Sequence, residues 1–390
     1  MTQLLSISAY LAIKEVRRNR GRFLLVSLVI ALITLLVLFI AALGEGLGNG
    51  NREYISKLDA QLIVYQAKSD FLISASRLSR DRLASIRRVA GVADVGALGT
   101  ASATLILPNG AKPLKVSMLG VEPGQTGEPP VVTGQPLSTS QAKEVIIDRN
   151  TALRSKLALG DTLTLRVTQG TSDEFYDLRV VGISGGQQYS LQPSIFVPFN
   201  TWDRVRPKSE NEVNSSTAVA NVILVKLEDP AQVDAVSQRL TSEVDNIQTA
   251  TLNTAIQALP GYSAQQSTLN TQGGFTLFIG ILVIGGFFQI QILQKVSQIG
   301  VLKAIGTSNP LVAAASVIQI VIVTVIGVAI GAVLSFLFSL TFPPTVPIVF
   351  NGTTSALAVV ALLLIGPLGG LVSVRYAVRI EPLKALGLSS

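Results

Sequence analysis

The residue types that carry most enzyme chemistry are missing from this chain, which has 390 residues and contains no histidine and no cysteine. A Ser-His-Asp triad, a thiolate nucleophile and a cysteine–histidine zinc site are therefore excluded. The acidic pairs Asp173-Glu174 and Glu228-Asp229 lie in turn-like sequence, which is typical of solvated carboxylates. The sequence contains no G-x-x-x-x-G-K-[ST] phosphate loop. We therefore predict that the chain is not an enzyme and has no catalytic residue, metal site or cofactor of its own.

Glu45 is the acid nearest to a long apolar segment, and two interpretations of it remain open. It follows an uncharged stretch by two residues. It is either a hydrated carboxylate at a helix end or a ligand-contacting acid at the mouth of a cavity between subunits. Gly44, Gly46 and Gly48 surround it and would let another backbone or a flat ligand approach closely. Glu45 is thus a candidate substrate contact.

The composition indicates a membrane protein, because 48% of the residues are apolar and only 14% are charged, against about 25% charged in an ordinary soluble domain. A helix needs about 20 apolar residues to cross a bilayer core about 30 Å thick. Four uncharged segments meet this requirement, at residues 23–43, 273–293, 311–342 and 355–374. Since none contains an ionisable residue, a proton relay or an ion-coupled carrier is disfavoured.

Glycines in these segments predict close helix packing. The pairs Gly273-Gly274 and Gly285-Gly286 lie in or at the second segment, and packing explains them better than phosphate binding does. In the third segment, Gly327-x-x-x-Gly331 fits a face of small residues. That face could serve packing inside one subunit or contact between two copies, and the sequence leaves both open.

Basic residues near the segment ends predict the orientation, since cytoplasmic loops are enriched in lysine and arginine. Basic residues outnumber acids before the first segment, between the second and third, and after the fourth. We therefore expect residues 1–22, 294–310 and 375–390 to be cytoplasmic, together with both termini. Residues 44–272 and 343–354 then lie outside. The excess of basic residues is explained by this topology, and the sequence lacks the basic patches and aromatic stacking residues of nucleic-acid binding proteins. No nucleic-acid binding is therefore predicted.

The long outside segment predicts an α/β (α+β) domain. Strands are expected at 61–66, 91–107, 114–121, 144–148, 162–167, 178–183 and 221–227, and helices at 46–58, 78–89 and 230–244. This order predicts two subdomains, one split between about 44–123 and 208–272, the other a β-rich insert at about 124–207. The expected fold class is an α-helical membrane protein with four transmembrane helices and a large extracytoplasmic domain between helices 1 and 2. Residues 1–22 are expected to contain an interfacial helix.

The loop at 294–310 predicts a short amphipathic helix, because Ile299, Leu302 and Ile305, together with Val301, recur at helical spacing. One interpretation is a connector on the membrane surface with the lysines Lys295 and Lys303 reaching to water. The other is a docking helix that fits a groove of a cytoplasmic partner.

This organisation resembles the permeases of the MacB/FtsX superfamily of ABC transporters. Their loop motif E-I-G-x-L-[RK]-A-x-G is similar to residues 298–306, although Gln298 replaces the usual glutamate, and their closing D-P-x-x-A-L is similar to residues 381–386. Residues 11–30 and 260–270 look like HrtB-type haem exporters, and DevC-type exporters have similar loops. The resemblance assigns ATPase coupling to Gln298, Ile299, Gly300, Val301, Leu302, Lys303, Ala304, Ile305 and Gly306.

The resemblance implies a homodimer in the bacterial plasma (inner) membrane, in contact with membrane lipid and bound to two copies of a cytoplasmic ABC ATPase that holds ATP and Mg. It leaves a periplasmic adaptor open. The permease would transmit motion from the ATPase to the outside domain and export haem, a lipid, a drug or a peptide. For haem, the missing histidine and cysteine leave Glu45, a tyrosine such as Tyr54, or Met118 as axial groups. The alternative is an FtsX-like signalling subunit that controls an extracytoplasmic cell-wall enzyme.

Overall fold

The computed structural model describes residues 2–107, 112–208, 219–342 and 346–379, of which residues 2–7 are described by their backbone alone. The chain divides into two compact units. The helical unit comprises Met1–Gly46 and Gln266–Ser390, and the sheet domain comprises Leu47–Gln265. Most of the predicted cytoplasmic tail, including the D-P-x-x-A-L-like motif, lies outside the described residues.

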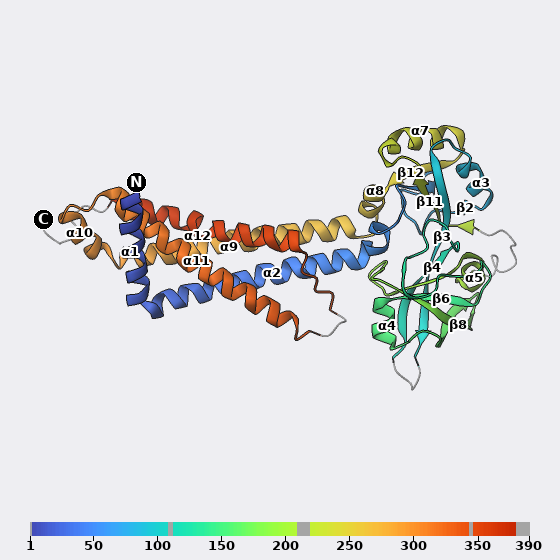
Figure 1. The fold of residues 1–390 in the computed structure, drawn as a ribbon, viewed down its shortest axis with the longest axis horizontal. Helices are drawn as coiled ribbons and strands as arrows, with labels where there is room; N and C mark the ends of the chain where they lie inside the picture. The colour runs from blue at the N-terminus through green and yellow to red at the C-terminus, as the bar shows by residue number, and fades with distance from the viewer. Residues whose placement is uncertain (1, 108–111, 209–218, 343–345, 380–390) are drawn as a thin grey trace. The chain divides into compact units, whose positions relative to one another are not determined.

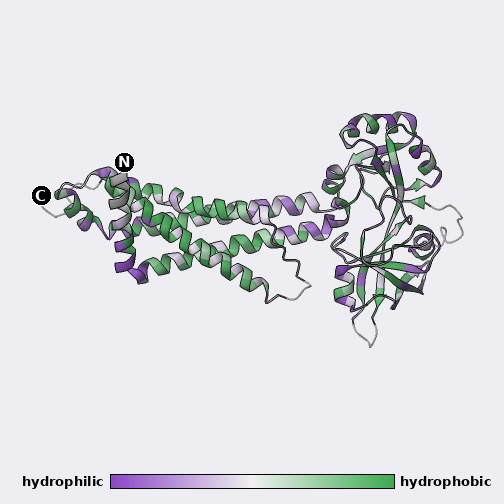
Figure 2. Cartoon of the chain, in the orientation of Figure 1, coloured by the Kyte–Doolittle hydropathy of each residue, from purple (hydrophilic) through white to green (hydrophobic). Residues whose placement is uncertain are grey.

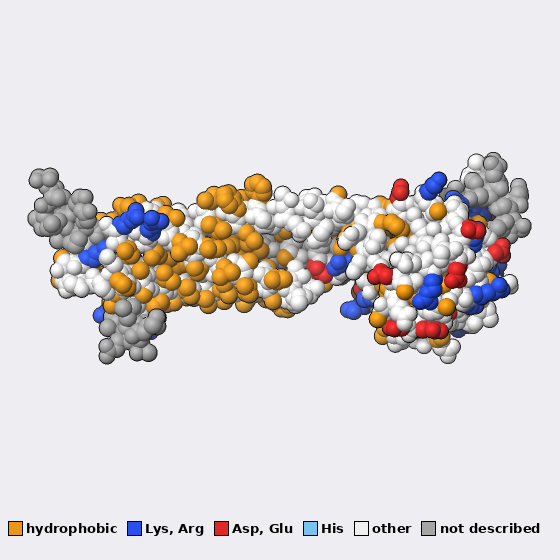
Figure 3. Space-filling model, turned by 90° about the horizontal axis from the view of Figure 1, so that it is seen from above, with side chains coloured by type: hydrophobic (Ala, Val, Ile, Leu, Met, Phe, Trp, Pro, Cys, Tyr) orange, Lys and Arg blue, Asp and Glu red, His pale blue; other side chains and the backbone are white. Residues whose placement is uncertain are grey.

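Among the described residues, four helices are long and apolar enough to cross a membrane. Each predicted span overlaps one of them: α2 (Arg20–Ser56), α9 (Tyr262–Leu293), α11 (Asn309–Ser339) and α12 (Gly352–Arg379) (Figure 1). Hydropathy separates these helices from α1 (Thr2–Arg18), whose visible residues are more hydrophilic (Figure 2). Hydrophobic side chains cover the visible face of the bundle (Figure 3), which is typical of a surface in contact with lipid.

Glycines allow the membrane helices to approach closely. A Cβ atom at Gly285 in α9 would lie 2.7 Å from the carbonyl oxygen of Gly369 in α12. A Cβ atom at Gly327 would lie 2.6 Å from the Cβ atom of Ile30 in α2, and one at Gly331 would lie 2.5 Å from a backbone oxygen of the same helix. The Gly327-x-x-x-Gly331 face therefore packs inside the subunit, against α2.

The remaining glycine pairs behave differently. A Cβ atom at Gly273, Gly274 or Gly286 would have no neighbouring atom within 4 Å. The prediction of close packing from the two glycine pairs is therefore wrong for these three positions within the described chain, because their Cα atoms face away from the other helices. It is right for Gly285.

The sheet domain contains one mixed sheet of ten strands in the part that the structure describes. Its order is β12-β1-β11-β3-β4-β9-β6-β8-β5, and β7 joins it by pairing with β3 and β8. The strands are β1 (Leu62–Gln66), β3 (Val92–Ile106), β4 (Leu114–Val121), β5 (Val131–Gly134), β6 (Glu144–Asp148), β7 (Thr162–Gln169), β8 (Ser172–Ser184), β9 (Ser194–Pro198), β11 (Val222–Leu227) and β12 (Ile247–Thr251). A separate pair joins β2 (Leu78–Ser79) to β10 (Val219–Ala220).

The predicted insert at 124–207 supplies β5 to β9, together with the helices α4 (Arg149–Ser155) and α5 (Phe199–Val205). It joins the same sheet, because β9 pairs with β4 in parallel and β7 pairs with β3. The first part of the domain carries α3 (Asp81–Arg87) and α7 (Val233–Glu243), whose apolar residues pack with those of β1 and β11. The long strand β3 thus contributes to both parts.

Local sequence signals explain several element boundaries. The Asp229 side chain accepts a hydrogen bond from the Ala231 amide, which starts η2 (Pro230–Gln232) and then α7, as the Asp-Pro sequence predicts. The predicted helix at 78–89 is wrong at its beginning, because Leu78 and Ser79 pair with β10. Several short elements escaped prediction, among them the helices α4 and α8 (Leu252–Gln257). The carboxylate of Asp148 accepts from the Thr151 amide at 2.6 Å and begins α4, and Thr251 caps α8.

The neighbours Gly285 and Gly286 provide a matched test of the helix packing. We expect Gly285→Ala to lower the thermal stability of the detergent-solubilised chain, because the new methyl group meets the α12 backbone at 2.7 Å. Gly286→Ala should leave stability unchanged or raise it, because its methyl group meets open space. Thermal unfolding of both variants in one detergent checks this. Equal effects of the two substitutions would contradict the packing of α9 on α12.

Candidate functional site

The helix α10 (Val296–Ala304) lies in the loop between the second and third spans and is anchored on one side. Ile299 is buried with Ile292, Val312 and Ala377, which come from the helices α9, α11 and α12. At the other end of α10, the Lys303 ammonium donates to the carbonyl oxygen of Val378 at 2.6 Å. The inward side of α10 is therefore held by all three of these membrane helices.

Apolar side chains near the end of α10 and directly after it are accessible, and one of them, Leu302, also lines the cavity described below. Val301 is 46% exposed, Leu302 38% and Ile305 75%. The sequence placed Ile299 in one apolar set with Val301, Leu302 and Ile305, but the structure buries Ile299 and leaves the other three exposed. Gly306 follows with a φ of 95°, a conformation that favours glycine, and ends the element. This exposed apolar face is a candidate docking surface.

The other predicted coupling residues divide between these two sides. Gly300 is buried, Lys303 is half-buried, and Gln298, Ala304 and Gly306 are exposed. Gln298 occupies the position where the motif usually has a glutamate, and its side chain lines a cavity. The described motif residues thus include both anchoring and exposed positions.

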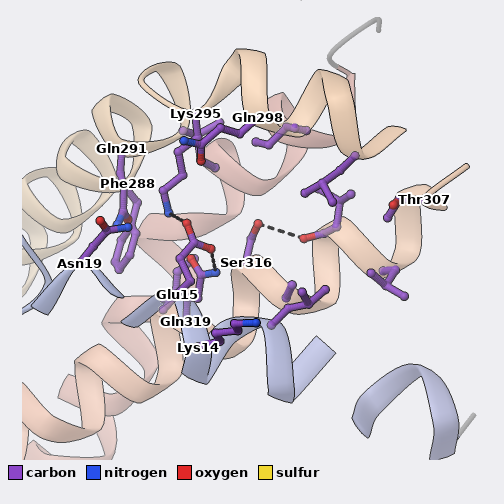
Figure 4. A pocket seen from close by; sticks show the side chains of 18 of the residues that line it. Lys14, Glu15, Asn19, Phe288, Gln291, Lys295, Gln298, Thr307, Ser316 and Gln319 are labelled. Atoms are coloured by element: carbon purple, nitrogen blue, oxygen red, sulfur yellow. Dashed lines mark hydrogen bonds and ion pairs between the residues drawn. The ribbon is translucent and has the colours of Figure 1, made fainter. Parts of the chain in front are cut away.

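A cavity of about 350 Å³ lies behind α10, between α1, α9, α10 and α11 (Figure 4). The Lys295 ammonium pairs there with one carboxylate oxygen of Glu15, and the Gln319 amide donates to the other at 2.5 Å. The ammonium also lies 5.4 Å from the centre of the Phe23 ring, which adds a cation–π contact. These contacts tie α1 to the residues just before α10 and to α11.

The burial of this network makes its charges interdependent. The side chain of Lys295 is 11% exposed and that of Glu15 is 28% exposed. A partly buried ion pair is costly to break, since removal of one partner leaves the other charge without compensation. Only two features of the sequence pointed to this network, the single acid in the N-terminal basic cluster and the lysine directly after the second span. The expectation that Lys295 reaches to water is wrong, because its side chain is only 11% exposed.

The structure separates the two candidate substrate contacts by unit. Glu45 belongs to the helical unit, where it is half-buried and accepts a hydrogen bond from the Asn351 amide at 3.3 Å. Tyr54 belongs to the sheet domain, where it is 2% exposed. Its hydroxyl donates to the carbonyl oxygen of Gly127 at 2.9 Å, and its ring packs on Phe196. Tyr54 is thus largely buried in the core of the sheet domain, and Met118 is fully buried.

The side chains of the described residues contain no group of three or more aspartates and glutamates that could hold a metal ion. The region of α10 combines exposed apolar side chains with residues that anchor the helix to the membrane bundle.

Family comparisons cover most of the chain. Residues 23–243 match the family described as MacB-like periplasmic core domain, and residues 271–382 match the family described as FtsX-like permease C-terminal. A protein of Staphylococcus epidermidis named hemin transport system permease HrtB is 25% identical over 379 residues, which are 97% of this chain and 99% of that protein. An uncharacterized ABC transporter permease of Mycobacterium tuberculosis is 24% identical over 392 residues, with the same coverage of both chains.

Two solved structures are also similar to part of the chain. The periplasmic region of MacB from Actinobacillus actinomycetemcomitans has 13% identity and a TM-score of 0.37, and the match covers 54% of this chain and 94% of that one. The extracellular domain of the transporter YknZ from Gram-positive bacteria has 15% identity and a TM-score of 0.36, and the match covers 49% of this chain and 99% of that one.

The Glu15–Lys295 pair predicts a non-additive pair of substitutions. We expect Glu15→Gln to reduce the free energy of unfolding by about 1 to 3 kcal/mol, because it leaves the Lys295 ammonium largely buried without its carboxylate. The double variant Glu15→Gln/Lys295→Met should lose less than the two single losses combined. Unfolding of the four proteins by SDS in mixed micelles measures both quantities. Strict additivity would show that the two charges do not interact.

Proposed function

Because this chain belongs to the MacB-like family of ABC transporter permeases, we propose that it is the non-catalytic membrane subunit of an efflux transporter. A separate cytoplasmic ATPase supplies the energy, and α10 receives its motion. The observation that carries this proposal is the two-sided character of α10. Val301 and Leu302 in α10 and Ile305 directly after it are exposed, while Ile299 of α10 packs into the membrane bundle.

An exposed apolar helix face rimmed by polar residues is suited to a groove of a partner protein. Val301, Leu302 and Ile305 would enter such a groove on the ATPase, while Gln298 and Lys303 lie beside them in α10. The ATPase can shift the permease only if its nucleotide states bind two permease conformations differently. Contacts at α10 would supply that difference.

The route from α10 to the sheet domain follows from chain connectivity. The chain passes between the two units twice, at Gly46–Leu47 and Gln265–Gln266. The first passage lies inside α2 and the second inside α9. A helix transmits displacement along its axis because each turn is hydrogen-bonded to the next. This supports mechanotransmission from the loop at 294–310 to the sheet domain through α9 and, by way of the Glu15 network and α1, through α2.

The topology and assembly complete the proposal. The proposed topology has both termini and α10 in the cytoplasm and the sheet domain outside the bacterial plasma membrane, and the basic residues of 1–22, 294–310 and 375–390 support it. The transporter contains two copies of this chain and two of the ATPase, which binds ATP and Mg. The open space beside Gly273, Gly274 and Gly286 is compatible with close approach of a second copy. A periplasmic adaptor remains part of the hypothesis.

The substrate we propose is a hydrophobic or amphipathic molecule that enters from the membrane. The relative from Staphylococcus epidermidis is named for hemin transport, which makes haem one member of this class, beside lipids, drugs and peptides. In this chain Glu45 is the candidate contact, since it is half-buried at the outer end of the first span and next to Asn351. Tyr54 is not carried into the proposal, because it lies in the core of the sheet domain.

The docking role of α10 has a direct test. We expect Ile305→Asp to abolish stimulation of the partner ATPase in a reconstituted complex, because it places a charge in the centre of the apolar contact. Leu302→Asp should act alike, whereas Ile305→Val should retain stimulation because it keeps the surface apolar. Membrane insertion and thermal stability should be unchanged in all three. Normal stimulation by the aspartate variants would refute docking through α10.

The role of Glu45 can be separated from a purely structural one. We expect Glu45→Ala to weaken substrate-dependent transport about tenfold while the ATPase still assembles, because a charged contact to the substrate is lost. Asn351→Ala removes the same Asn351–Glu45 hydrogen bond but leaves the carboxylate in place. Transport assays with haem and with a fluorescent amphipathic dye compare the two variants. Equal losses in both would assign Glu45 to the support of its neighbouring loop.

A further inference from the structure

The helix α1 runs across the helical unit, whereas the four long helices run along it (Figure 1). One side of α1 is packed against the bundle, since Ser8 and Ala12 are fully buried. On the same side, Glu15 pairs with Lys295, which lies two residues after the end of the predicted second span. This pair sets α1 at the depth where a span ends, which is the depth of the lipid headgroups.

The other side of α1 combines apolar and basic side chains. Tyr10, Ile13, Lys14 and Arg17 are separated by three or four positions, so they share one face of the helix. Tyr10 is 63% exposed and Ile13 is 49% exposed, and the two basic residues are exposed as well. The Lys14 ammonium lies 5.6 Å from the centre of the Tyr10 ring. Such a face is typical of a helix that lies in the interface between lipid and water.

The turn from α1 into α2 enlarges the basic part of this face. At the turn, the Asn19 amide donates to the carbonyl oxygen of Glu15 at 3.0 Å, and the Asn19 carbonyl oxygen accepts from the Phe23 amide at 3.2 Å. Five exposed basic residues lie on the last turns of α1 and around this turn. We call them the basic surface, and they are Lys14, Arg17, Arg18, Arg20 and Arg22.

The charges of the basic surface are uncompensated within the part of the chain that the structure describes. None of the five residues forms an ion pair with a described residue. The Arg20 Nε donates to the carbonyl oxygen of Arg17 at 3.1 Å, a contact with a neutral group. Five like charges in one short segment create a positive potential that attracts anions.

Acidic residues are scarce throughout the helical unit. Its sequence contains three of them, Glu15, Glu45 and Glu381. The carboxylate of Glu15 is turned to the bundle, where Lys295 and the Gln319 amide bind it. Glu45 follows the other end of the first span, and Glu381 lies outside the described residues. The acid closest in sequence to the basic surface is therefore held on the opposite side of α1.

An apolar surface follows the basic surface directly along the chain. Leu24, Leu25 and Leu28 in the first turns of α2 are 67%, 55% and 48% exposed. Exposed leucines on a membrane helix face acyl chains. A phospholipid carries its phosphate next to its acyl chains, so this order of basic and apolar residues matches the order of groups in a lipid. A soluble anion would use the basic residues alone.

We propose that the basic surface binds the phosphate groups of anionic phospholipids, with Tyr10 and Ile13 inserted in the interface beside them. Lysine and arginine clusters on amphipathic helices and next to membrane spans recognise such lipids. Zwitterionic lipids fit less well, because each phosphate is accompanied by a cationic group. Since Glu15 on the other side of α1 holds Lys295 just before α10, the bound lipid helps to fix the start of α10. The proposed function enters only in assigning these lipids to the cytoplasmic leaflet.

The absence of cysteine allows a local measurement, because Ile13→Cys accepts one fluorophore at a single place. The labelled full-length chain is placed in phosphatidylcholine nanodiscs that contain increasing amounts of brominated phosphatidylglycerol or brominated phosphatidylcholine, whose bromine atoms quench the fluorophore. We expect phosphatidylglycerol to reach half of the maximal quenching at a mole fraction about three- to tenfold lower. High salt should reduce this preference. Equal quenching by the two lipids would overturn the proposal.

Two double variants that remove the same charge locate the site. Arg17→Gln/Arg18→Gln should reduce the preference for phosphatidylglycerol about threefold, because two phosphate-binding groups are lost. Arg375→Gln/Arg379→Gln, at the end of α12, should leave it unchanged. Arg17→Lys/Arg18→Lys keeps both charges and should retain most of the preference, which separates charge from folding. Equal losses in the two glutamine variants, or no loss in the first, would show that the basic surface is not the site.

A truncated chain tests whether the protein covers its own basic surface. Residues 380–390 contain Glu381, and a chain that ends at Arg379 lacks them. It should show the same lipid preference as the full-length chain. A preference that appears only after this truncation would make the tail the occupant and overturn the proposal. None of these measurements requires the ATPase, so the lipid site and the docking role of α10 can fail separately.

Discussion

The ion pair between Lys295 and Glu15 is the interaction on which the helical unit depends most directly. Lys295 directly precedes α10, and Glu15 lies near the end of α1. Their pairing, together with the Gln319 amide, joins three segments that are distant in the sequence. A largely buried ammonium cannot leave this arrangement without losing its compensation, so the beginning of α10 is fixed in position. The fixed position allows the rest of α10 to present an apolar face to solvent.

Packing between the membrane helices adds a second constraint of a different physical kind. Lipid tails are as apolar as leucine, so the hydrophobic effect does little to hold membrane helices together. Close backbone approach at Gly285 and Gly327 replaces it with van der Waals contact over a large area. The helix α10 packs against α9, α11 and α12, and α11 in turn packs against α2, so a displacement of α10 is resisted by several membrane helices.

In the sheet domain, one sheet connects two apolar cores. The strand β3 reaches both cores, pairing with β11 in the first and with β7 in the second. Among the described residues, β11 and β7 pair with β3 at separate places along one edge. Trp202 packs over Gly99 and Gly120, where any side chain would collide with its ring, and so covers one face of the sheet there.

The sequence alone determined the four membrane segments, most of the strands and the position of α10, because these depend on local hydrophobicity and spacing. It also determined the absence of histidine and cysteine chemistry. Only the tertiary structure decided which residues of α10 point outward, why Gly327 packs inside the subunit, and that Tyr54 belongs to a core. It also revealed the Glu15–Lys295 pair, whose members are 280 positions apart in the numbering. Such features arise from contacts between distant segments, and the local periodicity of a single sequence carries no record of which distant segments meet.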